Sequence, residues 1–317
     1  MDLEAANEPD TETFAPPRWQ RGGAPTWAVV VLAYGGWIGL TLGYHALPWW
    51  AILPAAACVM ALHGSLQHET IHGHPTRRRW LNEALGWAPL LLWLPYPIYR
   101  DQHRAHHDDA ILTDPFADPE SKYAAPADWP GFGAIRRAVL RANTTLLGRM
   151  TLGPALGVSD FLLREARALW AGGLRTGASR RRRIWALHAA ALVPVLAWLW
   201  WCAVPLWAYV LLFVYPGVSL TLLRSFAEHI AAADPKARTV TVEGSVFFAL
   251  LFLNNNLHAL HHARPALPWY ALPALYRRGA PPALRYGGYG ALARRFLLRP
   301  IHAPVHPLAP EAAREPR

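Results

Sequence analysis

The sequence contains few cysteines and few charged residues. Only two cysteines occur among 317 residues, and Cys58 and Cys202 each lie inside an apolar stretch. So small a number excludes, within this sequence, a disulfide framework, a CxxC redox motif and a cysteine-ligated iron–sulfur cluster. Charged residues make up 16% of the chain and hydrophobic residues 53%, whereas soluble domains carry about 25% charged residues. The composition therefore favours a membrane protein.

The beginning of the chain lacks the basic-then-apolar order of a signal peptide. Residues 1–25 are polar, acidic at the start and rich in proline, and we expect them to form a flexible cytoplasmic tail. The net charge is +10, but the arginines stand in blocks beside apolar runs, as in Arg77–Arg79 and Arg180–Arg183. This pattern is typical of cytoplasmic loops next to an anionic membrane leaflet. We therefore expect the membrane, and no nucleic acid, as a partner.

Four apolar runs approach the length of about 20 residues that spans a bilayer. They extend from Thr26 to about Tyr44, from about Leu47 to about Leu66, from Ile184 to about Val204, and from about Leu206 to Leu223. The short connections within each pair predict two hairpins, and the arginine blocks place both termini in the cytoplasm. The predicted fold is an all-α, multi-pass integral membrane protein with four transmembrane helices and a cytosolic helical cap.

Two further predictions concern the proline-interrupted segment after the first box and the boundaries of the membrane domain. Residues 84–99 are apolar but interrupted by three prolines, which predicts a helix lying in or dipping into the membrane interface. We expect residues 26–280 to form the membrane domain and residues 281–317 a cytoplasmic C-terminal segment with a disordered end.

Histidines are clustered in three boxes. The first box holds His68 and His72, the second His103, His106 and His107, and the third His258, His261 and His262. On a helix, spacings of three and four residues point imidazoles the same way. Imidazole binds iron, zinc, copper and nickel, and eight imidazoles exceed the ligands of one zinc ion. We therefore predict two metal ions on the cytoplasmic side, with His229 as a ninth ligand.

For other polar residues near the boxes, the sequence indicates a role in metal binding less strongly. The acidic run after the second box predicts a surface loop whose carboxylates can orient ligating imidazoles; it includes Asp108, Asp109, Asp114, Asp118 and Glu120. Asn254, Asn255 and Asn256 precede the third box, where they could cap a helix or hold a metal-bound water. We predict no metal role for the remaining histidines: His45, His63, His74, His188, His302 and His306.

Glu69 opens an alternative interpretation. His68-Glu69-Thr70-Ile71-His72 satisfies the zinc-protease pattern of two helical ligands and a general-base glutamate. An intramembrane protease would leave the second and third boxes without a function, so we rank it below a two-metal site. A histidine-rich metal carrier without catalysis is a further alternative.

The three boxes together resemble those of the membrane fatty acid desaturase and hydroxylase superfamily. The resemblance covers roughly residues 26–280 and rests on these motifs: His68-x-x-x-His72 after the second span, His103-x-x-His106-His107, and Asn256-Leu257-His258-x-x-His261-His262 after the fourth. It implies a four-span helical fold with a cytosolic, non-haem di-iron centre bound by the eight box histidines. His229 matches the additional histidine that desaturases place after the last span. The resemblance also implies dioxygen as co-substrate and a separate electron-donor protein.

Our leading hypothesis is an O2-dependent oxidoreductase that desaturates a fatty acyl or related lipid chain. The alternative on the same scaffold is a hydroxylase or ketolase acting on a hydrocarbon or carotenoid. The choice between them depends on substrate placement, which residue spacing does not encode.

Overall fold

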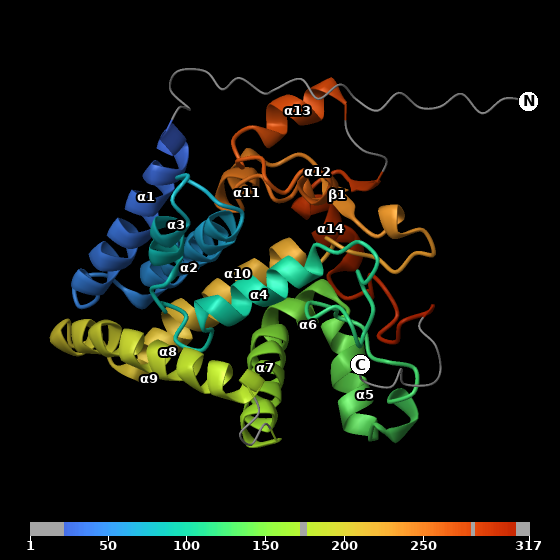
Figure 1. Ribbon diagram of the computed structural model, residues 1–317, viewed down its shortest axis with the longest axis horizontal. Coiled ribbons are helices and arrows are strands. Elements are labelled where there is room, and N and C mark those ends of the chain that lie inside the picture. The colour runs from blue at the N-terminus through green and yellow to red at the C-terminus, as the bar shows by residue number, and fades with distance from the viewer. Residues whose placement is uncertain (1–21, 172–175, 280–282, 309–317) are drawn as a thin grey trace, which may run out of the picture.

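The computed structural model describes residues 22–171, 176–279 and 283–308, and these residues are mainly helical (Figure 1). The long helices are α1 (Ala24–Leu42), α2 (Trp49–Ile71), α7 (Gly153–Ala171), α8 (Thr176–Trp201) and α10 (Tyr215–Ser225), the last preceded without a break by α9 (Leu206–Tyr209) and the π-helical turn η3 (Val210–Val214). The shorter helices are α3 (Arg79–Gly86), α4 (Tyr96–His106), α5 (Ala134–Asn143), α6 (Leu146–Thr151), α11 (Val246–Leu251), α12 (His258–Ala263), α13 (Leu272–Arg278) and α14 (Tyr289–Phe296). Two 3-10 turns, η2 (Trp129–Gly131) and η4 (Pro235–Ala237), and two strands, β1 (Val240–Val242) and β2 (Leu284–Tyr286), complete the described elements.

Four helical stretches are long and apolar enough to cross a membrane. They are Ala24–Leu42, Trp49–Ile71, Gly177–Trp201 and Leu206–Ser225, which confirms the four predicted spans and the helical membrane fold. The second helix continues beyond its predicted end at Leu66, so the first histidine box lies on the helix itself. Residues 43–48 and 202–205 connect neighbouring spans, and such short connections are consistent with two hairpins.

The helix α2 lies between α1 and α10 and contacts both along much of its length. Two glycines permit this close packing. A Cβ atom at Gly36 of α1 would lie 2.8 Å from Cγ2 of Val59, and one at Gly217 of α10 would overlap Met60. Small residues at helix contacts are typical of membrane proteins, because helix association in lipid depends on close van der Waals packing.

A buried polar chain joins the spans to the segment after α3. The indole Nε1 of Trp37 donates to the hydroxyl of Tyr209 at 2.9 Å, and that hydroxyl donates to the carbonyl of Leu90 at 2.8 Å. Both aromatic rings belong to an apolar cluster that also includes Ile52 and Met60. The polar groups are therefore paired where water is excluded.

The predicted interfacial helix over residues 84–99 is wrong. The helix α3 ends at Gly86, the next residues are irregular, and α4 begins only at Tyr96. Three prolines interrupt the run, and Leu92 has a positive φ of 69°, so a continuous helix is excluded. The break redirects the chain so that α4 contacts α2 and α8, which carries the second box to the first.

Beyond the last span, the described chain after Ser225 consists of short helices, turns and two strands, which is consistent with the predicted cap. Its two short strands pair in parallel, with Val240 opposite Leu284, and are the only strands among the described residues. Side chains of α14 pack in one apolar cluster with Leu223 and Phe226 at the end of α10. The predicted boundary at residue 280 stays a prediction. The segments 1–21 and 309–317, which contain most of the predicted tail and the predicted disordered end, lie outside the described residues.

Candidate metal centre

The structure brings all nine predicted histidines together in two groups. The first group consists of His68, His72, His103, His107 and His261, and the second of His106, His229, His258 and His262. Within each group, one ring nitrogen from every histidine lies within 4.8 Å of all the others. The groups are adjacent, because His106 and His107 are consecutive in the chain but belong to different groups, and so do His261 and His262. His107 of the first group stacks on His262 of the second, with ring centroids 4.3 Å apart.

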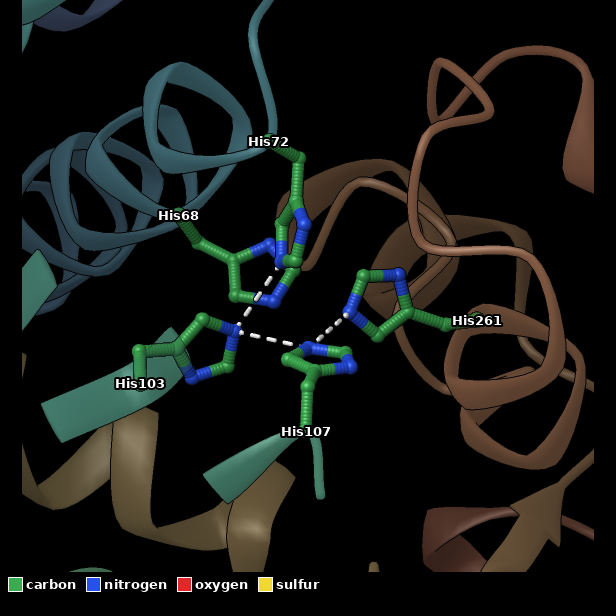
Figure 2. Close-up of side chains that lie close together, drawn as sticks. All are labelled: His68, His72, His103, His107 and His261. Carbon is green, nitrogen blue, oxygen red and sulfur yellow. Dashed lines mark hydrogen bonds between the residues drawn. The ribbon is translucent and has the colours of Figure 1, made fainter. Parts of the chain in front are cut away.

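The first group is built from three helix ends whose rings point at one another (Figure 2). His68 and His72 lie one turn apart at the end of α2, and His103 and His107 lie one turn apart at the end of α4. His261 approaches from α12. The Nε2 atom of His103 lies 3.0 Å from that of His72 and 3.1 Å from that of His107, which in turn lies 3.1 Å from Nε2 of His261.

The second group is centred on His229. This residue follows α10 and forms an isolated antiparallel bridge with Thr239. Its Nε2 atom lies 2.8 Å from Nε2 of His106 and 2.9 Å from Nε2 of His258. The rings of all four histidines are buried.

Carboxylates from the loop after α4 contact the outer nitrogens of two rings. The Nδ1 of His106 donates to Oδ1 of Asp118 at 2.9 Å, and the Nδ1 of His103 donates to Oε1 of Glu120 at 3.0 Å. Asp118 is buried and Glu120 is partly exposed. Such contacts fix the tautomer and the ring plane, so that the Nε2 lone pair faces the centre of the group.

The three asparagines have different contacts. Asn255 accepts a hydrogen bond from Nδ1 of His258 at 3.0 Å, so it contacts the second group directly. Asn254 and Asn256 donate to backbone carbonyls, the former to Trp269 at 3.0 Å and the latter to a β1 residue at 2.7 Å. None of the three caps α12 through its side chain. Of the two interpretations, helix capping therefore has no support, and Asn255 is the one asparagine that contacts a box histidine.

The donor atoms fit metal ions. The Nδ1 hydrogens of His106 and His258 are directed at Asp118 and Asn255, so both Nε2 atoms present lone pairs to His229 Nε2. The Nε2 atom of His229 carries at most one hydrogen, so it can donate to only one of these two nitrogens. At the other contact two lone pairs face each other unless a cation lies between them. Two imidazoles at a right angle around a metal with bonds of about 2.1 Å would have nitrogens about 3.0 Å apart. The observed separations of 2.8–3.1 Å match this geometry.

Burial keeps most of these imidazoles neutral, which is the form that binds metal. Burial, and then the neighbouring His103, lower the pKa of His72 to about 2. Burial likewise holds the pKa of His229 and of His261 well below the usual value. His106 is the exception: burial opposes protonation, but Glu120 and Asp118 raise its pKa to about 9. The carboxylates therefore favour a positive charge at this position, which a proton or a metal ion can supply.

Sequence reasoning missed a buried ion pair beside the second group. Arg224 and Glu228 lie 3.2 Å apart between Nε and Oε1, and the same Glu228 oxygen lies 3.6 Å from Nδ1 of His258. Both side chains are over nine-tenths buried. Opposite charges four residues apart at the end of an apolar span were the available signal, since charges at that depth are costly without partners.

Glu69 contacts neither group. Its Oε2 accepts a hydrogen bond from the backbone N–H of Trp269 at 3.3 Å, and the carboxylate is buried. It therefore anchors the segment after the third box to α2. This position gives the general-base interpretation of the zinc-protease pattern no support.

The fold and the site together define a membrane protein with two adjacent groups of histidines, arranged so that they could hold metal ions, at the ends of its spans. The sequence model of the family described as fatty acid desaturase matches residues 45–292, and this chain belongs to that family. No curated protein matches the sequence. Family membership makes the chain an oxidoreductase of the membrane with a lipid as substrate.

Proposed function

We propose that the protein is an O2-dependent di-iron oxidase that introduces a double bond into a fatty acyl or related lipid chain. The observation that carries the proposal is the pair of adjacent groups, with five and four imidazoles, in a chain of the fatty acid desaturase family. A purely nitrogen ligand set suits iron. All nine predicted ligands belong to these groups.

Each part of the site has a role in this proposal. The nine histidines would hold two irons, and Asp118, Glu120 and Asn255 would keep the ligating rings oriented. Bound iron would supply the activation of dioxygen and the abstraction of hydrogen from an unactivated C–H bond. Burial of the rings excludes water from the reaction.

The location of the groups supports a lipid substrate. His68 lies in the last turn of the span α2, and an apolar cluster includes Ala61 of the same helix with Leu223 and Phe226 at the end of α10. The histidines therefore lie where two spans meet an apolar cluster, which supports a substrate that arrives from the bilayer. Desaturation removes two hydrogens from adjacent carbons, and dioxygen takes them up with two electrons and two protons from a separate donor protein to give two molecules of water.

Lipid analysis tests the proposal. The full chain would be expressed in a host that lacks its own desaturase, beside a matched His261→Ala variant. We expect new double bonds only with the unaltered chain, and label from 18O2 in water and not in lipid. Unchanged lipids with an iron-loaded chain would refute the proposal. Label in a lipid alcohol or ketone would favour the alternative hydroxylase or ketolase.

The proposal includes the sidedness of the site. Arg77–Arg79 and Arg180–Arg183 lie on the side of the spans where the histidines gather, and basic residues favour the cytoplasm. The metal site and both termini are then cytoplasmic. Labelling of single cysteines at exposed Arg78 and at Trp49, at opposite ends of the spans, in intact cells tests this arrangement. Labelling of position 78 and not of position 49 by an impermeant reagent would contradict it.

A further inference from the structure

The helix α5 has an amphipathic sequence without a protein core beneath it. Ile135, Ala138, Val139 and Ala142 lie on one side at helical spacing, and Arg136, Arg137 and Arg141 lie on the rest of the circumference. None of its ten residues is buried, and the Ile135 side chain is 83% exposed. Its main neighbour among the helices is the short α6. In water, such exposure of an apolar face is unfavourable, so the face indicates a missing partner.

The arginines of α5 have no carboxylate partners among the described residues. Arg136 lies over the ring of Phe132 at 3.6 Å, Arg141 over that of Trp129 at 5.6 Å, and Arg137 donates to the carbonyl of Phe132 at 2.6 Å. By comparison, the exposed Arg164 on α7 is paired with Asp160 at 2.7 Å. The α5 segment therefore presents three cations and two aromatic rings beside an exposed apolar face.

We propose that residues 129–143 form an in-plane membrane anchor that binds anionic phospholipid headgroups. A helix with arginines on its polar face, an aliphatic face opposite and aromatic residues at its start is the type that lies in the headgroup region of a bilayer. The membrane is close at hand, because α5 leads through α6 and α7 into the span α8, and α6 also packs on the span α10. In Figure 1, α5 and α7 both extend downward from α6.

Features of α7 support the choice of a lipid surface over a protein partner. This helix also exposes large apolar side chains, with Leu163 at 55% and Trp170 at 92% exposure. Two neighbouring helices that both lack cover for aliphatic and aromatic residues fit one continuous surface, which a bilayer provides. The lipid ligand would be recognised by its phosphate, since planar guanidinium groups bind phosphate oxygens in pairs.

Spin labelling tests the anchor in the intact protein. An Ile135→Cys variant, in a background with Cys58→Ala and Cys202→Ala, would carry a nitroxide and be placed in nanodiscs of phosphatidylcholine with or without phosphatidylglycerol. An Ala117→Cys variant in the exposed acidic loop is the matched control. We expect the label at position 135 to collide with oxygen and be protected from a water-soluble nickel chelate, most strongly with phosphatidylglycerol. The label at position 117 should show the reverse.

Two further measurements separate the lipid from other occupants. A triple variant should show weaker protection of the label at position 135 from the nickel chelate; it combines Arg136→Gln, Arg137→Gln and Arg141→Gln. We expect a loss of about fivefold for each arginine that contacts an anionic surface. Equal nickel access at positions 135 and 117 in both bilayers would overturn the proposal. Protection that is equal with and without phosphatidylglycerol and unchanged by the three substitutions would also overturn it, because a second copy or another part of the chain would then cover the helix.

Discussion

The two histidine groups are held in place in different ways. In the first group, four of the five rings come in pairs one turn apart at the ends of α2 and α4. In the second group, only His258 and His262 form such a pair, on α12, whereas His229 lies outside any helix and His106 and His258 contact the polar partners Asp118 and Asn255. Helix geometry therefore preorganises more of the first group, whereas the second depends more on contacts between separate segments.

The carboxylates are also distributed unequally. Within the described residues, the first group has one close carboxylate, Glu120 at 3.0 Å from His103. The second has Asp118 at 2.9 Å from His106, with Asp109 and Glu228 each 3.6 Å from a ring nitrogen, and Glu120 also lies 3.9 Å from Nε2 of His106. Negative charge beside an imidazole makes it a stronger donor to a metal. We therefore expect the second group to respond more strongly to changes in its surroundings.

Removal of one ring from either group should have the largest effect. We expect His261→Ala and His106→Ala each to lower oxidation of lipid by at least about 100-fold, since even outer partners of a metal ligand contribute about 10- to 100-fold. The protein should remain in the membrane with its spans intact. Metal content per chain and product formation are the measurements, and His45→Ala, at an exposed histidine bonded to the carbonyl of Ala203, is the control. Normal activity of either variant would contradict the ligand assignment.

Changing the carboxylates compares the two groups directly. Asp118 accepts from His106, from the N–H of Thr113 and from the N–H of Glu120, whereas Glu120 is partly exposed. We expect Asp118→Asn to weaken metal retention by about 10- to 100-fold and the matched Glu120→Gln by about tenfold or less. Competition with a chelator measures both. Equal losses would show that the groups are held in the same way.

This contrast also explains which parts of the site could be predicted from the sequence. The four spans follow from long apolar runs, and the boxes follow from spacings of three and four residues that a helix turns into shared faces. His229 has no partner nearby in sequence, and its assignment rested on its position after the fourth span, on the same side as the boxes, and on the family resemblance. Its bridge with Thr239 and its contact with His106 are visible only in the fold.

The features that sequence reasoning missed depend on contacts between distant segments. Prolines marked residues 84–99 as irregular, but they did not show that the chain would form two separate helices, α3 and α4. The pairing of Glu228 with Arg224 was missed although the two charges stand four residues apart at the end of a span, and its proximity to His258 depends on a distant segment. Glu69 satisfied a motif by chance, since its hydrogen bond goes to Trp269, 200 residues away. Motif spacing therefore predicted which histidines lie together but not the residues that hold them in place.

Replacement of Arg238 tests whether contacts between segments distant in sequence stabilise the second group. Its Nη1 donates to the carbonyls of Ala110 and Leu112 at 3.2 and 3.1 Å, and its Nε donates to Ala232 at 2.8 Å. It thereby joins the loop after the second box to the turn that follows His229. We expect Arg238→Met to lower the free energy of unfolding by about 1–3 kcal/mol and to release metal from the second group first. Loss of metal from the first group alone would reverse the comparison.

Replacement of Glu69 should have a small effect on activity. The amide of Glu69→Gln keeps an oxygen that can accept from the N–H of Trp269, so we expect activity within about threefold of normal. Glu69→Ala should instead lower the free energy of unfolding by about 1–3 kcal/mol, because a buried N–H loses its acceptor. Thermal unfolding and the lipid assay measure the two effects. Complete loss of activity in Glu69→Gln with normal metal content would restore the general-base interpretation.

The smallest expected effect concerns the pH dependence of stability at the end of α10, which leads to His229. Lys122 donates to the carbonyls of Ser225 and Phe226, the latter at 3.1 Å, and burial lowers its pKa from 10.5 to about 7. Between pH 7 and 10.5 the unfolded chain therefore binds a proton that the folded chain has lost, so this group makes stability rise with pH over that interval. Lys122→Met should flatten the rise, whereas Lys236→Met, at the only other lysine in the sequence, should leave it unchanged. If both variants keep the slope of unfolding free energy between pH 7 and 10, Lys122 is charged in the folded protein and its contacts with α10 are ordinary surface hydrogen bonds.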